Sequence, residues 1–577
     1  MKAADYIARY LEHRRVTHVF ELIGGMITFL LDSLHQQTKI QIVSMHHEQG
    51  AGFAAEGYGR MSDVPGVAMA TSGPGATNLL TAIASCYFDS TPAVFITGQV
   101  NRHEQKGDRA IRQLGFQETD IVAMAVPVTK AAWLVNNPDD LPRLLEEAFA
   151  LAISGRPGPV LIDIPMDVQR AEITDLKYLH TPASHPTPAA ATSEAVARFW
   201  ANAGLDITRA KCPLILAGGG IRSSNAINSF RIWIESLQIP VVHSLMAVDV
   251  LPAGHPLRVG LIGSYGNRWA NIVLSECDLL LVVGSRLDVR QTGADTDSFK
   301  ANRLIYHVDC ELGELNNRVK GCHPLVSELP PFFSYAQENP VPAISLPAWT
   351  ARIAQLKAQW PDTGEQTGTS GINPNELMHQ ISALAGDASA FVVDVGQHQM
   401  WAAQSLDLGA SQRFLTSGGM GAMGFALPAA IGACLATAGR PVVVIAGDGG
   451  IQLNIQELQT VVRQKLPMKI IVLNNQCHGM VRQFQESYFK GRYQSTLWGY
   501  TAPSFKNLAQ AYGIASAYVS DPSLLLAALS ECWADPNTPF LLEVGIATEA
   551  NAYPKMAFGQ PISEMEPFAK PLEMEGT

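Results

Sequence analysis

Short apolar runs alternate with helical patterns along the first third of the chain. The apolar runs are His18–Ile23, Gln41–Met45, Gly66–Thr71, Pro92–Gly98 and Pro159–Ile164. Between them, Met26–His35, Gln49–Met61 and Ala76–Cys86 carry apolar residues at helical spacing. Near-continuous apolar strands that alternate with helices are typical of a parallel sheet with helices on both faces.

The same alternation recurs twice further along the chain. Its apolar runs are Pro213–Ala217, Leu279–Val283 and Leu304–Val308, and then Phe391–Val395, Pro441–Ala446 and Lys469–Leu473. Stretches rich in Pro, Ala, Thr or Gly separate the units, at His180–Thr192 and Pro340–Asn373. We therefore predict an α/β protein of three doubly wound parallel-sheet domains, at 1–175, 190–335 and 370–550, with a C-terminal tail at 551–577.

Two segments raise the question of targeting or a membrane. Charges interrupt Met1–Leu11, whose apolar residues sit at helical spacing, so we expect an amphipathic helix and not a signal peptide. Phe414–Gly439 is uncharged and long enough to span a membrane, but it contains several glycines and Pro428. We interpret it as a glycine-rich turn that runs into a buried helix.

Composition and charge exclude further classes. The chain has 577 residues, 47% hydrophobic and 16% charged, with a net charge of −11, which argues against a nucleic-acid partner. Its eight cysteines form no C-x-x-C pair, so we expect neither a zinc site nor a disulfide scaffold. A cytoplasmic location fits this cysteine pattern best. An acidic chain can still hold phosphates through backbone amides and a metal ion.

Two glycine turns resemble each other weakly. Ala70–Thr77 and Leu415–Ala422 both place a Thr-Ser-Gly sequence between a strand and a helix. This geometry lets backbone amides approach a ligand. Convergent turn chemistry explains the likeness equally well, so it does not by itself indicate a duplication.

The strongest chemical signal lies in the third unit. A predicted strand ends in Gly447–Gly450, Asn454 is then predicted to cap a helix, and the next strand ends in Asn474 and Asn475. Asp448 and Asn475 would therefore lie at the carboxyl edge of neighbouring parallel strands. A carboxylate, an amide oxygen and a backbone carbonyl form a hard oxygen site, which phosphates would complete around Mg²⁺.

This arrangement of Gly-Asp-Gly and paired Asn resembles the thiamine-diphosphate binding motif. A second match is Glu48, which follows an apolar strand at the start of a predicted helix. A glutamate there is ordinarily a solvated partner of the helix dipole. The resemblance implies instead that Glu48 hydrogen-bonds the cofactor's aminopyrimidine, where a carboxyl group can exchange a proton and favour the form that acts as internal base.

Almost the whole chain is similar to the acetolactate synthase family. The similar segments include Thr71–Asn78, Thr97–Val100, Phe116–Thr119, Gly155–Pro159, Val395–Ala402 and Asn474–Val481. The resemblance implies that the first domain binds the aminopyrimidine and the third binds the diphosphate and Mg²⁺. It also implies that the first domain of one chain meets the third domain of another, hence a homodimer or homotetramer, with Pro74 and Asn78 supplied by the other subunit.

The resemblance assigns roles residue by residue. The catalytic residues are Glu48 and Gln117, and the metal ligands are Asp448, Asn475 and the backbone carbonyl of Cys477. The cofactor-binding residues are Gly24, Pro74, Asn78, Val395, Gly396, Gln397, His398, Gly421, Met423, Gly447, Asp448, Gly449, Gly450, Asn475, His478, Gly479, Met480 and Val481. The substrate pocket consists of Phe116, Gln117, Met480 and Phe484. Without the resemblance, the methionines would be core residues and the histidines ordinary surface or hydrogen-bonded side chains.

The middle domain carries glycines after predicted strands but no complete G-x-G-x-x-G, so its own residues indicate a dinucleotide site only weakly. The resemblance implies FAD there, with Arg286 and Arg290 on its phosphates and Asp309 near a ribose hydroxyl. An empty or differently occupied fold is the alternative. The expected FAD-binding residues are Arg156, Gly218, Gly219, Gly220, Ser244, Leu245, Gly260, Leu261, Gly284, Ser285, Arg286, Asp288, Arg290, Asp309 and Cys310.

The chain departs from the biosynthetic acetolactate synthases near the expected substrate entrance. Phe484 stands where they usually carry a tryptophan, Met166 where they carry a lysine and Phe53 where they carry a histidine, and Arg112–Gly115 replaces Gly-Thr-Asp-Ala. A smaller ring and a lost cation would admit a larger or less anionic acceptor. Tyr553–Gly559 and Arg286–Gly293 resemble a side branch of ketone-accepting carboligases that also includes a cyclic-diketone hydrolase.

We therefore expect a thiamine-diphosphate- and FAD-dependent carboligase. It would decarboxylate pyruvate and transfer the two-carbon acetyl unit to a ketone, a ketosugar or a 2-keto acid, with small-molecule substrates and no nucleic-acid or membrane partner. A flavin-using pyruvate oxidase and a carbon–carbon hydrolase of cyclic diketones are the enzymatic alternatives. A non-catalytic regulatory or scaffold protein is the third.

Overall fold

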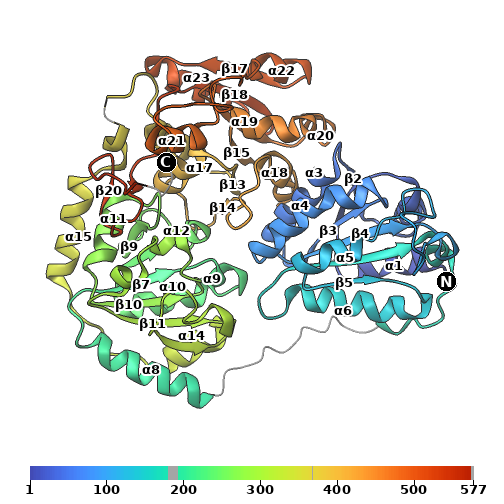
Figure 1. Ribbon diagram of the computed structural model, residues 1–577, viewed down its shortest axis with the longest axis horizontal. Helices are drawn as coiled ribbons and strands as arrows, with labels where there is room; N and C mark the ends of the chain where they lie inside the picture. The colour runs from blue at the N-terminus through green and yellow to red at the C-terminus, as the bar shows by residue number, and fades with distance from the viewer. Residues whose placement is uncertain (180–192, 367, 574–577) are drawn as a thin grey trace.

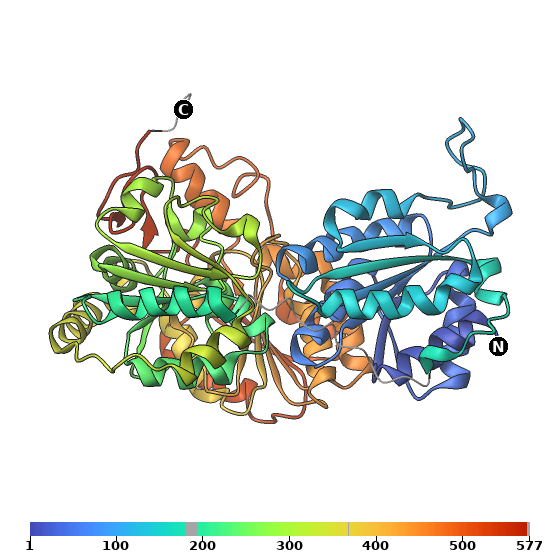
Figure 2. The same ribbon diagram turned by 90° about the horizontal axis from the view of Figure 1, so that it is seen from below.

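The computed structural model describes residues 1–179, 193–366 and 368–573, and it contains three six-stranded parallel sheets covered by helices (Figure 1). The predicted α/β class with three parallel-sheet domains is confirmed. The linker predicted at His180–Thr192 lies outside the described residues. The first domain stands beside the other two and meets them along one side (Figure 2).

The first domain has strand order β2-β1-β3-β4-β6-β5. Its amphipathic N-terminal helix, α1, buries Tyr6, Ile7, Tyr10 and Leu11, as the spacing predicts. Its strands are β1 His18–Leu22, β2 Gln41–Ser44, β3 Gly66–Ala70, β4 Ala93–Gln99, β5 Ala131–Leu134 and β6 Pro159–Pro165. Its helices are α1 Ala3–His13, α2 Thr28–Gln37, α3 Glu48–Met61, α4 Pro74–Phe88, α5 Ile121–Ala125, α6 Leu141–Ile153 and α7 Met166–Arg170.

The middle domain has strand order β12-β11-β10-β7-β8-β9, which reads 3-2-1-4-5-6 from the β9 edge. This is the order of doubly wound dinucleotide-binding folds. Its strands are β7 Pro213–Ala217, β8 Val241–His243, β9 Arg258–Leu261, β10 Leu279–Val283, β11 Leu304–Asp309 and β12 His323–Val326. Its helices are α8 Ser193–Ile207, α9 Gly220–Ser223, α10 Ile227–Leu237, α11 Arg268–Glu276, α12 Val289–Thr292, α13 Thr296–Lys300 and α14 Leu329–Glu338.

The third domain has strand order β14-β13-β15-β16-β18-β17. Before it, the Pro-rich stretch 340–373 contains a helix, α15 Pro347–Gln359, and a short turn, η8 Asp362–Gln366. The strands are β13 Ala390–Val393, β14 Arg413–Leu415, β15 Val442–Gly447, β16 Met468–Asn474, β17 Ala515–Val519 and β18 Phe540–Gly545. The helices are α16 Pro374–Leu384, α17 Gln397–Ser405, α18 Ala426–Ala436, α19 Asp448–Ile451, α20 Leu458–Arg463, α21 Gly479–Tyr488, α22 Phe505–Ala511 and α23 Leu525–Cys532.

The segment Phe414–Gly439 is the predicted glycine turn and buried helix, because α18 is fully apolar and lies in the core. No helix among the described residues is long and apolar enough to cross a membrane. The tail after β18 forms a small antiparallel hairpin, β19 Lys555–Met556 and β20 Met565–Glu566, which rests on the middle domain through Met556 N and Ser264 O.

The helix cap predicted at Asn454 is wrong. Helical turns begin already at Asp448, and Asn454 has a non-helical backbone (φ −133°) between α19 and α20. Its side-chain amide donates instead to Gly424 O at 2.9 Å and to Gln49 Oε1 at 3.1 Å. The Asn454 side chain is therefore engaged by a carbonyl of its own domain and by Gln49 of the first domain, and not by the start of α20.

Helices α3 and α18 cross closely and join the first and third domains in one core. A Cβ atom at Gly57 would lie 2.0 Å from Ala429 O, and one at Gly432 would lie 1.8 Å from Ala54 O. Only glycine permits such a backbone approach. Phe53, fully buried on α3, packs edge-on against Phe425 with the ring centroids 5.5 Å apart. The expectation that Phe53 lies at a substrate entrance is wrong, because the residue is part of this core.

Candidate active site

The predicted oxygen ligands end two adjacent strands of the third sheet. Strands β15 and β16 pair in parallel, so Asp448 and Asn475, which follow them, lie on one edge. Asp448 is buried, accepts a hydrogen bond from the Tyr500 hydroxyl at 3.1 Å, and has its pKa raised by burial to about 6. A nearby cation would favour the ionised carboxylate, so the residue suits a metal ligand.

Both the oxygen and the nitrogen of the Asn475 side-chain amide form hydrogen bonds. Its Oδ1 accepts from Cys477 N at 3.3 Å, and its Nδ2 donates to Gln397 Oε1 at 3.2 Å. Among the described residues, no group of three or more His, Cys, Asp or Glu side chains could hold a metal ion. A metal at this edge would therefore depend on amide and carbonyl oxygens and on ligands from outside the protein.

The segment Val395–His398 follows β13 and enters α17, and Gln397 bonds Asn475. A Cβ atom at Gly396 would lie 2.6 Å from the His398 ring, and one at Gly447 would lie 2.9 Å from it. The His398 Nε2 atom is buried without a hydrogen-bond partner, and burial lowers the pKa of His398 to about 3. A neutral ring with an orphaned nitrogen among close glycines fits a site that a bound group completes.

Other glycines predicted to bind the cofactor are equally tightly placed. A Cβ atom would meet the His478 ring at Gly449 (2.8 Å), Asp394 Oδ1 at Gly450 (2.7 Å) and Gln397 Oε1 at Gly479 (2.0 Å). Alanine at any of these positions would displace a polar side chain of the same edge.

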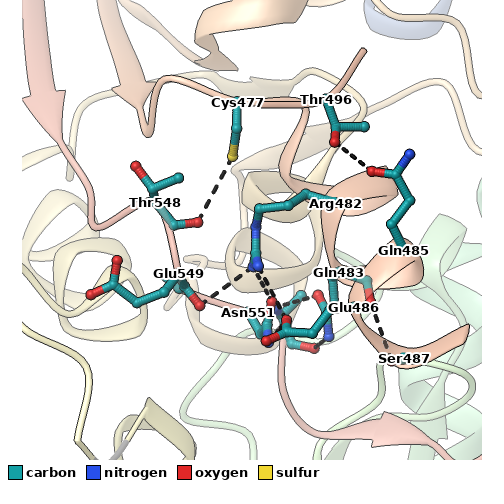
Figure 3. A network of polar contacts seen from close by, with 12 residues as sticks. Cys477, Arg482, Gln483, Gln485, Glu486, Ser487, Thr496, Thr548, Glu549 and Asn551 are labelled. Carbon is teal, nitrogen blue, oxygen red and sulfur yellow. Dashed lines mark hydrogen bonds and ion pairs between the residues drawn. The ribbon is translucent and has the colours of Figure 1, made fainter. Parts of the chain in front are cut away.

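The segment after β18 holds the loop Asn475–Cys477 and helix α21 in place (Figure 3). Thr548 Oγ1 donates to Asn475 O at 2.9 Å, and Cys477 Sγ lies 3.8 Å from Thr548 O. On α21, the buried Arg482 side chain bonds the Asn551 side chain and lies 3.4 Å from Glu549 O. The start of α21 and the loop before it are thus fixed by the segment Thr548–Asn551.

Glu48 is the first residue of α3 and is 8% exposed. Its Oε2 accepts from Asn78 Nδ2 of α4 at 2.9 Å, and a Cβ atom at Gly75 would lie 3.3 Å from its Oε1. Pro74 is the first residue of α4, which Gly73 precedes with a left-handed φ of +60°. The structure therefore brings Glu48, Pro74 and Asn78 together at the start of two helices.

The first and third domains of the chain meet beside Glu48. Gln49, next to Glu48, bonds Asn454, which bonds the carbonyl of Gly424, the residue after Met423. The backbone N–H of His46 donates to Glu457 Oε1 at 2.9 Å. That a second subunit supplies Pro74 and Asn78 stays a prediction. Gly24 packs against Thr71, and Gly421 has a left-handed φ of +66°.

The predicted acceptor residues occupy two exposed surfaces. Phe116 is 79% exposed, and Gln117 has a left-handed φ of +65° and packs against Gly73. On α21, Met480 is half-buried, while Val481 and Phe484 are 51% and 38% exposed. Phe484 packs against Tyr488 with the ring centroids 4.8 Å apart.

The middle-domain glycines meet at the switch point of their sheet, between β7 and β10. A Cβ atom at Gly218 would lie 2.0 Å from Gly284 O, and Gly220 N donates to Gly284 O at 2.9 Å. Ser285 Oγ donates to Gln291 at 2.6 Å, and a Cβ atom at Gly219 would lie 2.9 Å from Met246 Cβ. These glycines therefore let the two loops pack closely.

The charged residues expected around FAD have protein partners. Arg286 pairs with Asp288 at 3.2 Å, and Asp288 also caps α12 by accepting from Arg290 N. Arg156 pairs with Glu311 and Glu314 at 2.8 and 2.9 Å. The other expected residues lie at strand ends: Asp309 closes β11 with its pKa raised by burial, Cys310 is exposed, Ser244 and Leu245 follow β8, and Gly260 and Leu261 end β9.

Sequence reasoning missed several residues that organise the site. Asp394, directly after β13, accepts the backbone amides of Val395, Gly424 and Ala426. Tyr500 bonds Asp448, and Asn454 and Glu457 reach across to the first domain. Asp394 could have been found as an acidic residue that ends an apolar strand, but the others have no local signal.

Comparison with known proteins agrees with this geometry. Three family models match: the thiamine pyrophosphate enzyme N-terminal TPP binding domain at 1–124, the central domain at 204–334 and the C-terminal TPP binding domain at 394–544.

Three relatives illustrate the similarity. The chain is 38% identical to the acetolactate synthase isozyme 1 large subunit of Escherichia coli, over 97% of each chain. It is 36% identical to the large subunits of acetolactate synthase from Lactococcus lactis and Corynebacterium glutamicum. The matches cover 97% and 98% of this chain and 95% and 90% of theirs.

Proposed function

Because this chain belongs to the acetolactate synthase-like thiamine pyrophosphate enzymes, we propose that it decarboxylates pyruvate and transfers the acetyl unit to a second carbonyl compound. The observation that carries the proposal is the buried Glu48 carboxyl, whose neighbour Gln49 bonds Asn454, which in turn bonds the carbonyl of Gly424 beside Met423. Bound thiamine diphosphate supplies the electron sink for decarboxylation.

The chain's residues hold and activate that cofactor. Asp448, Asn475 and the carbonyl of Cys477 are the proposed ligands of Mg²⁺, and the Val395–His398 and Gly447–Gly450 segments are the proposed diphosphate cradle. Glu48 would hold at its carboxyl the proton that the aminopyrimidine takes up or returns when bound, and Asn78 keeps that carboxyl in place through Oε2. The buried position of Glu48 favours this proton exchange because it excludes competing water.

The acceptor is proposed to be a ketone, a ketosugar or a 2-keto acid. Phe484 presents a smaller ring than the tryptophan usual at this position, and its partner Tyr488 holds it against α21. A smaller aromatic side chain leaves room for a bulkier acceptor. Gln117, held in a left-handed conformation against Gly73, is the proposed polar contact to the acceptor.

FAD is the proposed ligand of the middle domain. The 3-2-1-4-5-6 strand order and the meeting of Gly218–Gly220 with Gly284 and Ser285 at its switch point support a dinucleotide there. Binding would require Arg156 and Arg286 to exchange their carboxylate partners for phosphates. A bound flavin that keeps its oxidised absorbance during turnover would agree with a structural role, whereas bleaching would favour a pyruvate oxidase.

A homodimer or homotetramer completes the proposal. Phe116 and Val481, both expected near the substrate, are largely exposed in the single chain, as a contact surface for a second copy would be. Light scattering of the purified protein measures this directly, and a monomer that is fully active would overturn it.

The decisive experiment supplies pyruvate, Mg²⁺, thiamine diphosphate and FAD, adds candidate acceptors in turn, and identifies products by NMR. We expect carbon dioxide release and a new carbon–carbon bond. Acetolactate alone would identify a 2-keto acid acceptor, and a tertiary alcohol would identify a ketone or ketosugar. Failure to release carbon dioxide from pyruvate with every acceptor would contradict the proposed reaction.

A further inference from the structure

Two carboxylates hold the two ends of the glycine turn 417–425, which connects β14 to α18 and carries Met423. At the distal end, Asp394 of the same domain accepts Gly424 N and Ala426 N, both at 3.0 Å. At the proximal end, Asp89 accepts Gly418 N at 2.9 Å and Gly419 N at 2.6 Å. Asp89 follows α4 and belongs to the first domain, so this anchor crosses the domain boundary.

Asp89 is itself fixed by a buried arginine. Arg60, at the end of α3, donates from Nη2 to Asp89 Oδ2 at 2.8 Å and to Glu56 Oε1 at 2.5 Å. Its Nη1 donates to Thr416 O at 2.7 Å. The side chains of Glu56, Arg60 and Asp89 are 0, 9 and 1% exposed. Hydrogen bonds between ionised groups out of water are among the strongest in proteins.

The backbone path of the turn 417–425 depends on these two carboxylates, Asp394 and Asp89. Gly421 and Gly424 have left-handed φ angles of +66° and +83°, a conformation that glycine adopts without strain but does not by itself enforce. The proximal end is also confined on both sides, since a Cβ atom at Gly418 would lie 2.3 Å from Met246 Sδ and one at Gly419 would lie 2.7 Å from Phe88 Cβ. Between its ends, Ala422 N bonds Ser417 Oγ at 3.1 Å.

We propose that Asp89, held by Arg60, is a positioning residue that sets the Met423 loop against the pyrimidine side of the cofactor site. The inference rests on the proposed contact between Met423 and the aminopyrimidine. The side chain of Asp89 bonds Arg60 and the loop residues Gly418 and Gly419, and no residue of the Val395–His398 segment or the Asp448–Asn475 edge is among its hydrogen-bond partners. It therefore acts on the pyrimidine end of the ligand and leaves the diphosphate end unchanged.

Calorimetric binding of two ligands distinguishes an effect on the pyrimidine end from one on the diphosphate end, and it needs no turnover. Thiamine diphosphate with Mg²⁺ uses both ends of the site, whereas inorganic pyrophosphate with Mg²⁺ uses only the diphosphate cradle. For Asp89→Ala, we expect the affinity for thiamine diphosphate to fall about 10-fold and that for pyrophosphate to stay within about twofold of the parent, because two charge-assisted hydrogen bonds to the loop are lost. Asp89→Asn keeps one acceptor oxygen, so its affinity for thiamine diphosphate should lie between those of the parent and Asp89→Ala.

A matched control is the buried ion pair of Arg268 and Glu365, which joins α11 to η8 with N–O distances of 2.7 Å. Glu365→Gln should lower thermal stability and leave both affinities unchanged. If Asp89→Ala does not fold, Asp89→Asn and Arg60→Lys carry the test.

Two results overturn the inference: an unchanged affinity for thiamine diphosphate, or an equal loss for both ligands, which would mean that Asp89 supports the fold only. A parent protein that binds pyrophosphate but not thiamine diphosphate would instead contradict the proposed function.

Discussion

The first and third domains are built on the same sheet but contribute different chemistry. Counted from the start of each sheet, both strand orders read 2-1-3-4-6-5. In the first domain, the second strand leads to Glu48, a single carboxyl suited to proton exchange. In the third, the third and fourth strands lead to Asp448 and Asn475, the proposed oxygen ligands of Mg²⁺. A shared scaffold therefore fixes where loops lie, and the residues at the strand ends decide what each domain does.

The two similar glycine turns do not occupy corresponding places in these sheets. Thr71–Pro74 follows β3, the third strand of its sheet, whereas Thr416–Gly419 follows β14, the second strand in order of its own. Their likeness thus reflects what a close backbone approach requires of a turn. The relation between the domains lies in strand order, which a comparison of short motifs does not detect.

The largest expected effect removes the proton chemistry of the first domain alone. Glu48→Gln keeps the size of the side chain and its hydrogen bond to Asn78, but it cannot exchange a proton. We expect turnover of pyruvate to fall about 100- to 10,000-fold, the range of general acid–base catalysis, with thiamine diphosphate affinity largely retained. Carbon dioxide release and calorimetry measure the two quantities.

The control is Glu21→Gln, at a buried glutamate of the same sheet that bonds Ser44. Its turnover should remain near that of the parent. Unchanged turnover in Glu48→Gln would reject the role assigned to Glu48, and a parallel collapse of cofactor affinity would erase the contrast between the two domains.

The next effect removes the ligand chemistry of the third domain. Asp448→Asn should weaken Mg²⁺-dependent binding of thiamine diphosphate by about 100-fold, because even indirect partners of a metal ligand cost 10- to 100-fold when changed. Titration with Mg²⁺ at fixed thiamine diphosphate measures the loss. A variant that binds as tightly as the parent would show that the metal, if present, has other ligands.

A smaller effect concerns the acceptor. Phe484→Trp restores the ring usual in biosynthetic acetolactate synthases on the exposed face of α21. We expect the ratio of kcat/KM for a 2-keto acid acceptor to that for a bulky ketone to rise about 10-fold, within the range that pocket size alone provides. Competition between the two acceptors, followed by NMR, gives the ratio. Tyr488→Phe, which keeps the ring that packs on Phe484, is the control and should leave the ratio unchanged.

Sequence reasoning found the elements and the residues that face one another along a single sheet. The strands around Asp448 and Asn475 were predicted within one or two residues, and their parallel pairing places both side chains on one edge. It failed where the partner lies in another domain. Asp89 and Gly418 are 329 residues apart, and Asn454 and Gln49 are 405 apart. Periodicity and capping rules describe neighbours along the chain, so they carry no information about such contacts.

The smallest effects separate the two domains by the pH dependence of their stability. In the first domain, Asp163 is buried between Thr97 and Gln99, and burial raises its pKa to about 7. In the third, His379 lies between Asp362 and Asp407, whose hydrogen bonds raise its pKa to about 10. In both cases the folded protein binds more protons than the unfolded chain, so stability falls as pH rises.

The two stability contributions are lost over different pH ranges, and the last prediction uses this difference. The contribution of Asp163 falls between its unfolded pKa near 4 and about 7. That of His379 is fully present below about 6.5 and is lost as pH rises toward about 10. Asp163→Asn should therefore flatten the melting temperature between pH 4 and 7 only, and His379→Gln should flatten it between pH 6.5 and 10 only. Each variant is the control for the other in differential scanning fluorimetry. If both variants changed the melting temperature in the same pH window, the two domains would share one pH dependence of stability, as they share one strand order.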